Sequence, residues 1–205
     1  KTTTFNLVTG LLRPDSGEVQ MDGRAVAELS MPERARLGIG YLPQEASVFR
    51  NLSVHDNLML ALQESGAPKA QRRERVEQLV DDFQLRPFSQ RRGFQLSGGE
   101  RRRCEVARAL AVGEHGPRYL LLDEPFAGVD PIAVEDIQSI VSQLKDKGIG
   151  ILITDHNVQE TLTITDRAYL LFEGSILKSG TAEELANDEQ VRKVYLGQNF
   201  VLRKK

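Results

Sequence analysis

The sequence has little of several things that mark specialised classes of protein. Its 205 residues include no tryptophan and one cysteine, Cys104, and a lone thiol cannot close an internal disulfide. This cysteine content fits a reducing compartment. The 27 lysines and arginines nearly balance the 29 acidic residues, so no strong positive field draws the chain to nucleic acid. No uncharged apolar stretch approaches the roughly 18 residues that suggest a membrane span.

What is present is the composition of a globular domain. Hydrophobic residues make up 40% of the chain, which is enough to bury a core, and the length suits one domain with or without a subdomain. No signal peptide is visible. Because the sequence starts on Lys1 rather than on methionine, we expect that the natural N-terminus lies upstream.

Apolar spacing and turn residues predict strands that alternate with helices. Continuous apolar runs at 119–123 and 150–155 are typical of parallel strands covered on both faces. The other predicted strands are one that starts at Gly38 and ends at Pro43, and two hairpins, at 18–26 with a turn at Asp22-Gly23 and at 168–180 with a turn at Glu173-Gly174. The predicted helices cover 1–12, then 52–85 with a cap at Ser53, then a stretch from Ser97, and finally two short helices before a basic tail.

This alternation predicts an α/β fold with a mostly parallel sheet. The helical block at about residues 45–115 interrupts the alternation, so we expect it to form a helical subdomain. The remainder would complete a single domain over residues 1–205. No internal repeat or low-complexity tract suggests a different organisation.

The chain opens with "KTTTF" at the start of a predicted helix. Lysine followed by threonine at a helix start is the second half of the phosphate-binding loop G-x-x-x-x-G-K-[ST]. In such a loop Lys1 would reach the β- and γ-phosphates, and the hydroxyl of Thr2 would ligate magnesium. Taken alone, an ordinary helix start is the better interpretation, because the glycines are not in this sequence.

The apolar run "YLLL" ends in two adjacent acids, Asp123 and Glu124, followed by Pro125. Neighbouring side chains of a strand point to opposite faces, so the two carboxylates are expected to have separate tasks. Asp123 would hold Mg²⁺, directly or through water, as the strand-end aspartate of a nucleotide site does. Glu124 would then polarise an attacking water as the general base. Taken alone, an Asp-Glu pair at a strand end is more often a solvated loop; here the four apolar residues before it and the proline and glycine after it weigh against that alternative.

The stretch "LSGGERRR" predicts a helix start of an unusual kind. Ser97 and Glu100 form a capping box, and residues 101–103, all arginine, are expected to face solvent. This does not explain Gly98 and Gly99, because glycine is a poor residue in a first helical turn unless something approaches the backbone closely. An anion at the helix N-terminus is the natural candidate.

"LSGGE", followed about two dozen residues later by "LLLDEP", resembles the nucleotide-binding domain of ATP-binding-cassette (ABC) proteins. The likeness covers nearly the whole chain, in order. It implies a P-loop NTPase (RecA-like) core that binds ATP and Mg²⁺ and hydrolyses ATP. It also implies first strands, phosphate-loop glycines and an adenine-stacking aromatic residue upstream of Lys1, which this sequence does not include.

The resemblance assigns roles residue by residue. Glu124 and His156 match the catalytic glutamate and the switch histidine. Thr2, Gln44 and Asp123 match the residues around the magnesium ion. The residues that match the nucleotide-binding motifs are Lys1, Thr2, Thr3, Gln44, Ser97, Gly98, Gly99 and Asp130. In this family the signature loop of one subunit closes over ATP held by another, which implies a homodimer with ATP at the interface.

More narrowly, "QEASVF", "DHNVQETL" and "VYLGQNF" are similar to segments of the ATPases that power lipopolysaccharide export. This likeness implies two ATPase copies bound to two transmembrane permease subunits at the cytoplasmic face of the inner membrane. The ATPase would be cytoplasmic and peripheral, touching the membrane only through the permeases. ATP hydrolysis would extract lipopolysaccharide from the inner membrane for transfer to the outer membrane.

Other members of the same superfamily remain as alternatives. The first alternative is the ATPase subunit of a branched-chain amino-acid importer, since those subunits share many of the same sequence features. ABC ATPases of DNA repair or translation usually carry a long coiled-coil insertion, whereas only 53 positions (97 − 44) separate Gln44 from Ser97. A non-hydrolysing homologue is disfavoured because Glu124 and His156 are both present.

Phe49 and Arg50 are the candidates for coupling to the permeases. Phe49 either tucks into the helical block or helps line an apolar groove that receives a short permease helix. The groove interpretation gains support from Gln44, which is expected to sense nucleotide and lies only a few residues before Phe49. The arginine clusters at 72–73, 91–92 and 101–103 are interpreted as solvated faces, although Arg91 and Arg92 are also candidates for the permease contact.

Overall fold

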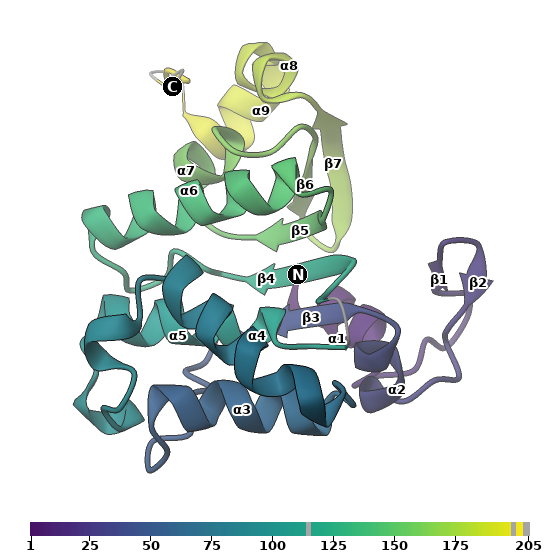
Figure 1. The fold of residues 1–205 in the computed structure, drawn as a ribbon. Coiled ribbons are helices and arrows are strands. Elements are labelled where there is room, and N and C mark those ends of the chain that lie inside the picture. The colour runs from purple at the N-terminus through teal and green to yellow at the C-terminus, as the bar shows by residue number, and fades with distance from the viewer. Residues whose placement is uncertain (114–115, 198–199, 203–205) are drawn as a thin grey trace. The chain divides into compact units, whose positions relative to one another are not determined.

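The computed structural model describes residues 1–113, 116–197 and 200–202. The chain forms two compact units, residues 1–154 and 155–205 (Figure 1). The first unit holds the parallel sheet and most of the helices. The second is a hairpin covered by short helices.

A three-stranded parallel sheet with the order β3-β4-β5 lies at the centre of the first unit. Its strands are β3 (Ile39–Leu42), β4 (Tyr119–Asp123) and β5 (Gly150–Thr154). The predicted α/β class with a parallel sheet is therefore confirmed. The expectation that both long apolar runs are covered on both faces is wrong for β5. Its Leu152 is 42% exposed and none of its five residues is fully buried, so β5 is covered less completely than β4.

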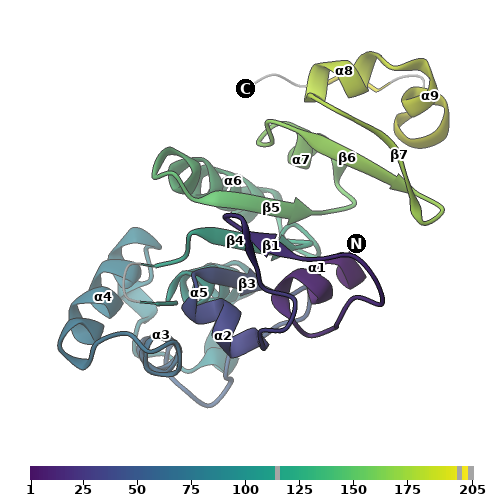
Figure 2. The same cartoon turned by 90° about the vertical axis from the view of Figure 1, so that its right-hand side faces the viewer.

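Helices cover the sheet of the first unit (Figure 2): α1 contacts β4, α2 and α5 contact β3, α6 contacts β5, and α3 packs on α4 and α5. The bounds are α1 (Thr2–Thr9), α2 (Met31–Arg36), α3 (Val54–Glu64), α4 (Lys69–Asp82), η1 (Arg86–Phe88), η2 (Gly93–Gln95), α5 (Gly98–Leu110) and α6 (Pro131–Asp146). The sequence did not predict α2. The single helix expected over 52–85 is two helices, because Gly66, at φ +83°, and Pro68 break it.

The first helix is anchored by a buried arginine. α1 ends at Gly10, whose φ is +86°, and is therefore shorter than the predicted 1–12. Arg34 of α2 is almost fully buried, and its guanidinium donates to the carbonyls of Leu7 and Val8 at 2.6 and 2.8 Å. A cation at these carbonyls satisfies groups that a helix end leaves unpaired. Arg34 thereby fixes the helix that begins beside Lys1.

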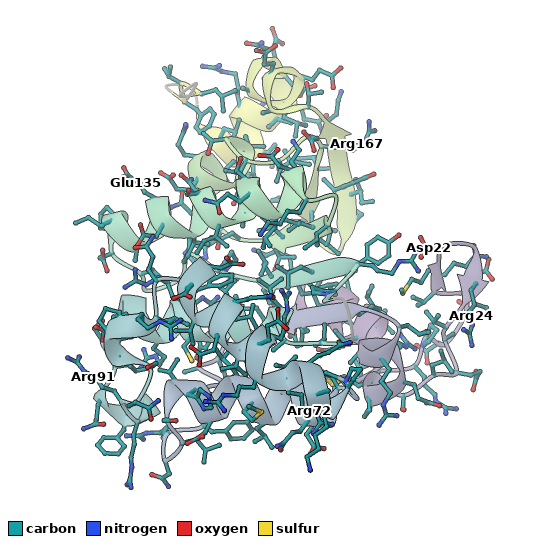
Figure 3. The ribbon with its side chains drawn as sticks, in the orientation of Figure 1. Asp22, Arg24, Arg72, Arg91, Glu135 and Arg167 are labelled. Carbon is teal, nitrogen blue, oxygen red and sulfur yellow. The ribbon has the colours of Figure 1, made fainter. Side chains whose placement is uncertain are left out.

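The predicted hairpin around Asp22-Gly23 is confirmed as β1 (Gln20–Met21) and β2 (Arg24–Ala25). Both turn residues have positive φ, +51° and +76°, as a two-residue hairpin turn requires. Asp22, which is labelled in Figure 3, lies at the tip of this hairpin. Its carboxylate accepts a hydrogen bond from the hydroxyl of Tyr119 and lies 2.6 Å from the guanidinium of Arg118. These contacts hold the turn against the beginning of β4.

The second unit is built on the antiparallel pair β6 (Ala168–Phe172) and β7 (Ser175–Gly180), which confirms the predicted terminal hairpin. Its helices are α7 (Val158–Leu162), α8 (Ala182–Asn187), α9 (Glu189–Val191) and η3 (Arg192–Leu196). A small core joins them, formed by Leu162, Leu170, Leu185 and Val191. The predicted basic tail, at 203–205, lies outside the described residues. Within the described part of the chain, no helix is both long enough and apolar enough to cross a membrane.

Candidate functional site

Strand β4 ends in the acid Asp123, and a second acid of different character, Glu124, follows it directly. Asp123 is buried, with 1% of its surface exposed, whereas the side chain of Glu124 is 19% exposed. Glu124 has φ +46°, a left-handed conformation that is unfavourable for a residue with a side chain. Such strain persists only where surrounding contacts fix the backbone, and it is typical of functional sites. The geometry supports separate tasks for the two acids.

Three segments meet at the carboxylate of Glu124. Oε2 accepts a hydrogen bond of 2.9 Å from Nε2 of Gln44, and Oε1 lies 3.6 Å from Nζ of Lys1. Lys1 precedes α1, Gln44 follows β3 and Glu124 follows β4, so residues far apart in the sequence converge at one edge of the sheet. A lysine and an amide beside this partly exposed carboxylate form a polar site that could bind phosphate groups and a reacting water.

The carboxylate of Asp123 is suited to a metal ion. Oδ1 accepts a hydrogen bond from Oγ1 of Thr154, and Oδ2 is buried without a hydrogen-bond partner among the described residues. Those residues contain no cluster of three histidine, cysteine or acidic side chains that could hold a metal on their own. Mg²⁺ usually takes one or two carboxylates and completes its shell with waters and substrate phosphates. A single buried carboxylate with one unpaired oxygen therefore fits Mg²⁺.

The predicted capping box at the start of α5 is confirmed, with Ser97 as the N-cap and Glu100 as its partner. A side chain at Gly98 would meet nothing within 4 Å, so packing within the chain does not require glycine there. A Cβ at Gly99 would lie 3.3 Å from Ala133 and 3.9 Å from the carboxylate of Asp130, the N-cap of α6. Gly99 therefore has a packing role, whereas the open space at Gly98 leaves room for another molecule.

The remaining candidate residues lie as follows. Thr2 and Thr3 form the first turn of α1 and are exposed. His156 belongs to the second unit, where its Nδ1 lies 3.7 Å from Oδ1 of Asp155. The histidine side chain is 66% exposed and is therefore accessible to a ligand.

Arg102 corrects the prediction that all three arginines of residues 101–103 face solvent, since it is only 7% exposed. Its guanidinium donates to the carbonyl oxygens of Pro43, Glu124 and Pro125 at 3.2 to 3.4 Å. It also forms an ion pair of 3.2 Å with Glu105. The periodic pattern of a helix does not reveal a long polar side chain that reaches inward to main-chain carbonyls, so this role of Arg102 could not be predicted.

The network continues from Glu105 to the loop that carries Phe49. Oε1 of Glu105 accepts the N–H groups of Ser47 and Val48 at 2.8 and 3.3 Å. Asn57, fully buried in α3, then holds Phe49 by accepting from its N–H at 2.8 Å and donating to its carbonyl at 3.1 Å. Buried polar groups thus form a continuous path from the backbone of Glu124 to Phe49.

Phe49 lies at the surface and is not buried among the helices. Half of it is exposed, and the guanidinium of Arg108 lies 5.1 Å from the centre of its ring. A second aromatic residue that the sequence analysis missed, Phe94, is 52% exposed, and its N–H donates to the carbonyl of Arg50. A Cβ at Gly93 would lie 2.9 Å from the carbonyl of Phe49, so only glycine allows this close approach. Arg91 lies on the outer side of the same segment (Figure 3).

Cys104 takes no part in chemistry at this site. It lies buried in α5, and burial raises the pKa of its thiol to about 12. Only a thiolate is a good nucleophile, so a thiol that stays protonated at neutral pH excludes covalent catalysis by this cysteine.

The comparisons with known proteins point in one direction. The family model described as "ABC transporter" matches residues 1–127. A solved ATP-binding cassette of an ABC transporter superposes with a TM-score of 0.85 at 28% identity, covering 96% of this chain and 83% of that one. Its ADP conformation gives a TM-score of 0.80, also at 28% identity, over 97% and 84% of the two chains.

Curated relatives are more similar in sequence. The lipopolysaccharide export system ATP-binding protein LptB of Haemophilus influenzae is 52% identical over 203 residues, which cover 98% of this chain and 83% of that protein. The protein of the same name from Escherichia coli is 51% identical over the same shares. The likeness extends well beyond the short nucleotide-binding motifs.

Proposed function

The chain belongs to the ABC transporter family of ATP-binding domains, and from this premise we propose that it is the ATPase subunit of a lipopolysaccharide export system. It is an ATPase whose hydrolysis is coupled to transport. The observation that carries the proposed cargo is the identity of 51–52%, over 98% of the chain, to ATP-binding proteins named for lipopolysaccharide export. The same likeness supports a peripheral position on the cytoplasmic face of the inner membrane.

The residues at the end of β4 divide the work of hydrolysis. Lys1 and the first turn of α1 would bind the β- and γ-phosphates. Asp123, assisted by Thr2 and Gln44, would hold Mg²⁺, which neutralises phosphate charge when bound. Glu124 would accept the proton of the attacking water, and Gln44 and Lys1, which both contact its carboxylate, keep it in place. His156 would contact the γ-phosphate.

We propose that Ser97, Gly98 and Gly99 contact the ATP that is bound to a second copy of the chain. The open space at Gly98, together with the positive end of the α5 dipole, supports an anion there. A head-to-tail homodimer would place this loop against ATP bound at the Lys1 end of the partner, with Asp130 at the same interface. Hydrolysis then depends on dimer closure, which allows ATP turnover to drive movement in bound subunits.

The proposed partners are two transmembrane permease subunits that resemble LptF and LptG. In each ATPase copy, Phe49 and Arg50 are proposed to bind one permease. Phe49, on its loop, and Phe94, in the adjoining η2, are exposed aromatic side chains, which suits a short permease helix as the occupant. The polar path from Glu124 through Arg102 and Glu105 ends at the Phe49 loop. A change at the nucleotide would therefore reach the permease contact through a few buried hydrogen bonds.

Proteoliposomes provide the direct test of the cargo. The full-length protein with its two permeases and lipopolysaccharide in the bilayer is expected to release lipopolysaccharide when ATP is added, measured as lipopolysaccharide captured outside the vesicles. Vesicles with Glu124→Gln should release none. ATP hydrolysis at an unchanged rate with no lipopolysaccharide released, under conditions where the complex is intact, would contradict the proposed cargo.

Phe49→Ala should leave the fold and the ATPase rate of the isolated subunit nearly unchanged and weaken binding to the permeases. An exposed ring contributes little to the core, whereas an aromatic anchor in a protein interface typically contributes about 2 kcal/mol or more. Co-purification with the permeases and thermal melting of the free subunit measure the two effects. Tyr169→Ala is a matched control, because Tyr169 is also an exposed aromatic residue under an arginine, Arg167. A much lower melting temperature with normal assembly would show that Phe49 is a core residue.

A further inference from the structure

Thr154 is the last residue of β5 and lies directly beside Asp123, its partner in the parallel ladder. The Oγ1 hydroxyl donates a hydrogen bond to Oδ1 of Asp123. The carbonyl oxygen of Thr154 accepts the N–H of Glu124 at 2.7 Å. One residue of the neighbouring strand thus contacts both acids at the end of β4. No motif in the sequence pointed to it.

This hydrogen bond distinguishes the two oxygens of the Asp123 carboxylate. Oδ1 is satisfied by the hydroxyl of Thr154, whereas Oδ2 is buried and has no hydrogen-bond partner among the described residues. The terminal torsion of an aspartate has broad minima, so an unrestrained carboxylate samples many orientations. A donor on Oδ1 narrows that range and keeps Oδ2 pointing in one direction.

We propose that Thr154 is a positioning residue that holds the carboxylate of Asp123 in the orientation that binds Mg²⁺. Thr154 acts through Asp123 and does not itself contact the metal or the nucleotide. The inference rests on the proposed role of Asp123 and adds to it the residue that orders it. Partners that orient a metal ligand typically account for about 10- to 100-fold in metal affinity.

Thr154→Val in the full-length protein tests this role. Valine removes the hydroxyl and keeps the β-branched shape that suits a strand. With Mn²⁺ as a spectroscopic substitute for Mg²⁺, the affinity of the protein–ADP complex for Mn²⁺ should fall about 10- to 100-fold, measured by electron paramagnetic resonance. ADP binding in EDTA should stay as in the wild type. Thr154→Ser keeps the hydroxyl and should restore Mn²⁺ affinity.

Ser65→Ala is the control for loss of a buried hydroxyl, because Ser65, which is far in the sequence from Asp123, donates to the carbonyls of Leu62 and Ala111. It should leave Mn²⁺ affinity unchanged. If Thr154→Val does not fold, Thr154→Ala removes the same hydroxyl with a smaller side chain. Wild-type Mn²⁺ affinity in a folded variant without the hydroxyl would overturn the inference.

Asp123→Asn separates this inference from the proposed metal site. If Asp123→Asn loses Mn²⁺ while Thr154→Val binds it normally, Asp123 holds the metal and the positioning role of Thr154 is wrong. If Asp123→Asn binds Mn²⁺ as the wild type does, the metal role of Asp123 fails and the role of Thr154 fails with it. If Mn²⁺ affinity falls in both Asp123→Asn and Thr154→Val, and Thr154→Ser restores it, the result supports the metal role of Asp123 and the positioning role of Thr154.

Discussion

In the full-length protein, Glu124→Gln should bind ATP as the wild type does and hydrolyse it about 10²- to 10⁴-fold more slowly. Glutamine has the same size and keeps an oxygen that can accept the hydrogen bond from Gln44. It cannot take a proton from water, so only the chemical step should be lost. Phosphate release under saturating ATP measures the rate, and a separate titration with labelled ATP measures binding.

Two further variants make this result specific. Glu45→Gln changes an exposed carboxylate on the same segment as Gln44 and should keep wild-type turnover. Asp123→Asn should instead weaken binding that depends on Mg²⁺, so the two neighbouring acids should fail in different ways. Turnover at the wild-type rate in Glu124→Gln would remove Glu124 from the role of general base.

The sequence predicted the fold wherever short-range patterns determine the structure. The apolar runs of β4 and β5, the Asp22-Gly23 turn and the capping box at Ser97 each depend on residues close together in the chain. Each is specified by backbone and side-chain chemistry within a few positions. The α/β class and the parallel sheet follow from the order of these elements, and both are confirmed.

What the sequence could not predict depends on long-range contacts. Arg102 reaches carbonyls of Pro43 and Pro125, and its place in a run of three arginines made solvent exposure the natural expectation. Thr154 matters because the register of two strands sets it beside Asp123. Helix α2 has only six residues, and the buried Arg34 that anchors it gives no apolar signal. Polar side chains that serve main-chain groups far away in the sequence leave no periodic pattern.

Glu105→Ala should destabilise the protein by about 3 kcal/mol or more, because it removes one partner of a buried ion pair. Glu105 is 3% exposed and pairs with Arg102 at 3.2 Å. Its other oxygen accepts the N–H groups of Ser47 and Val48, which would lose this partner, the Val48 N–H in a buried position. In a domain of this size each 1 kcal/mol lowers the melting temperature by roughly 2–4 °C, so we expect a loss of about 6–12 °C.

An exposed pair supplies the comparison. Glu77 pairs with Arg86 on the surface, and Glu77→Ala should barely change the melting temperature, because exposed ion pairs are screened by water and salt. If Glu105→Ala lowers the melting temperature no more than Glu77→Ala does, the buried ion pair contributes no more to stability than the exposed one. Glu105→Gln should lower the melting temperature by an intermediate amount, less than Glu105→Ala and more than Glu77→Ala, since its amide oxygen can still accept from the loop.

The double variant shows whether the cost comes from an unpaired charge. Arg102→Met alone leaves Glu105 charged and buried, although the two loop N–H groups still donate to it. Combined with Glu105→Ala, it removes both charges, and the total loss should be smaller than the sum of the two single losses. Additive losses would mean that the two residues act independently. Since Arg102 binds the carbonyl of Glu124 and Glu105 binds the loop before Phe49, independence would also break the proposed path from the nucleotide to the permease contact.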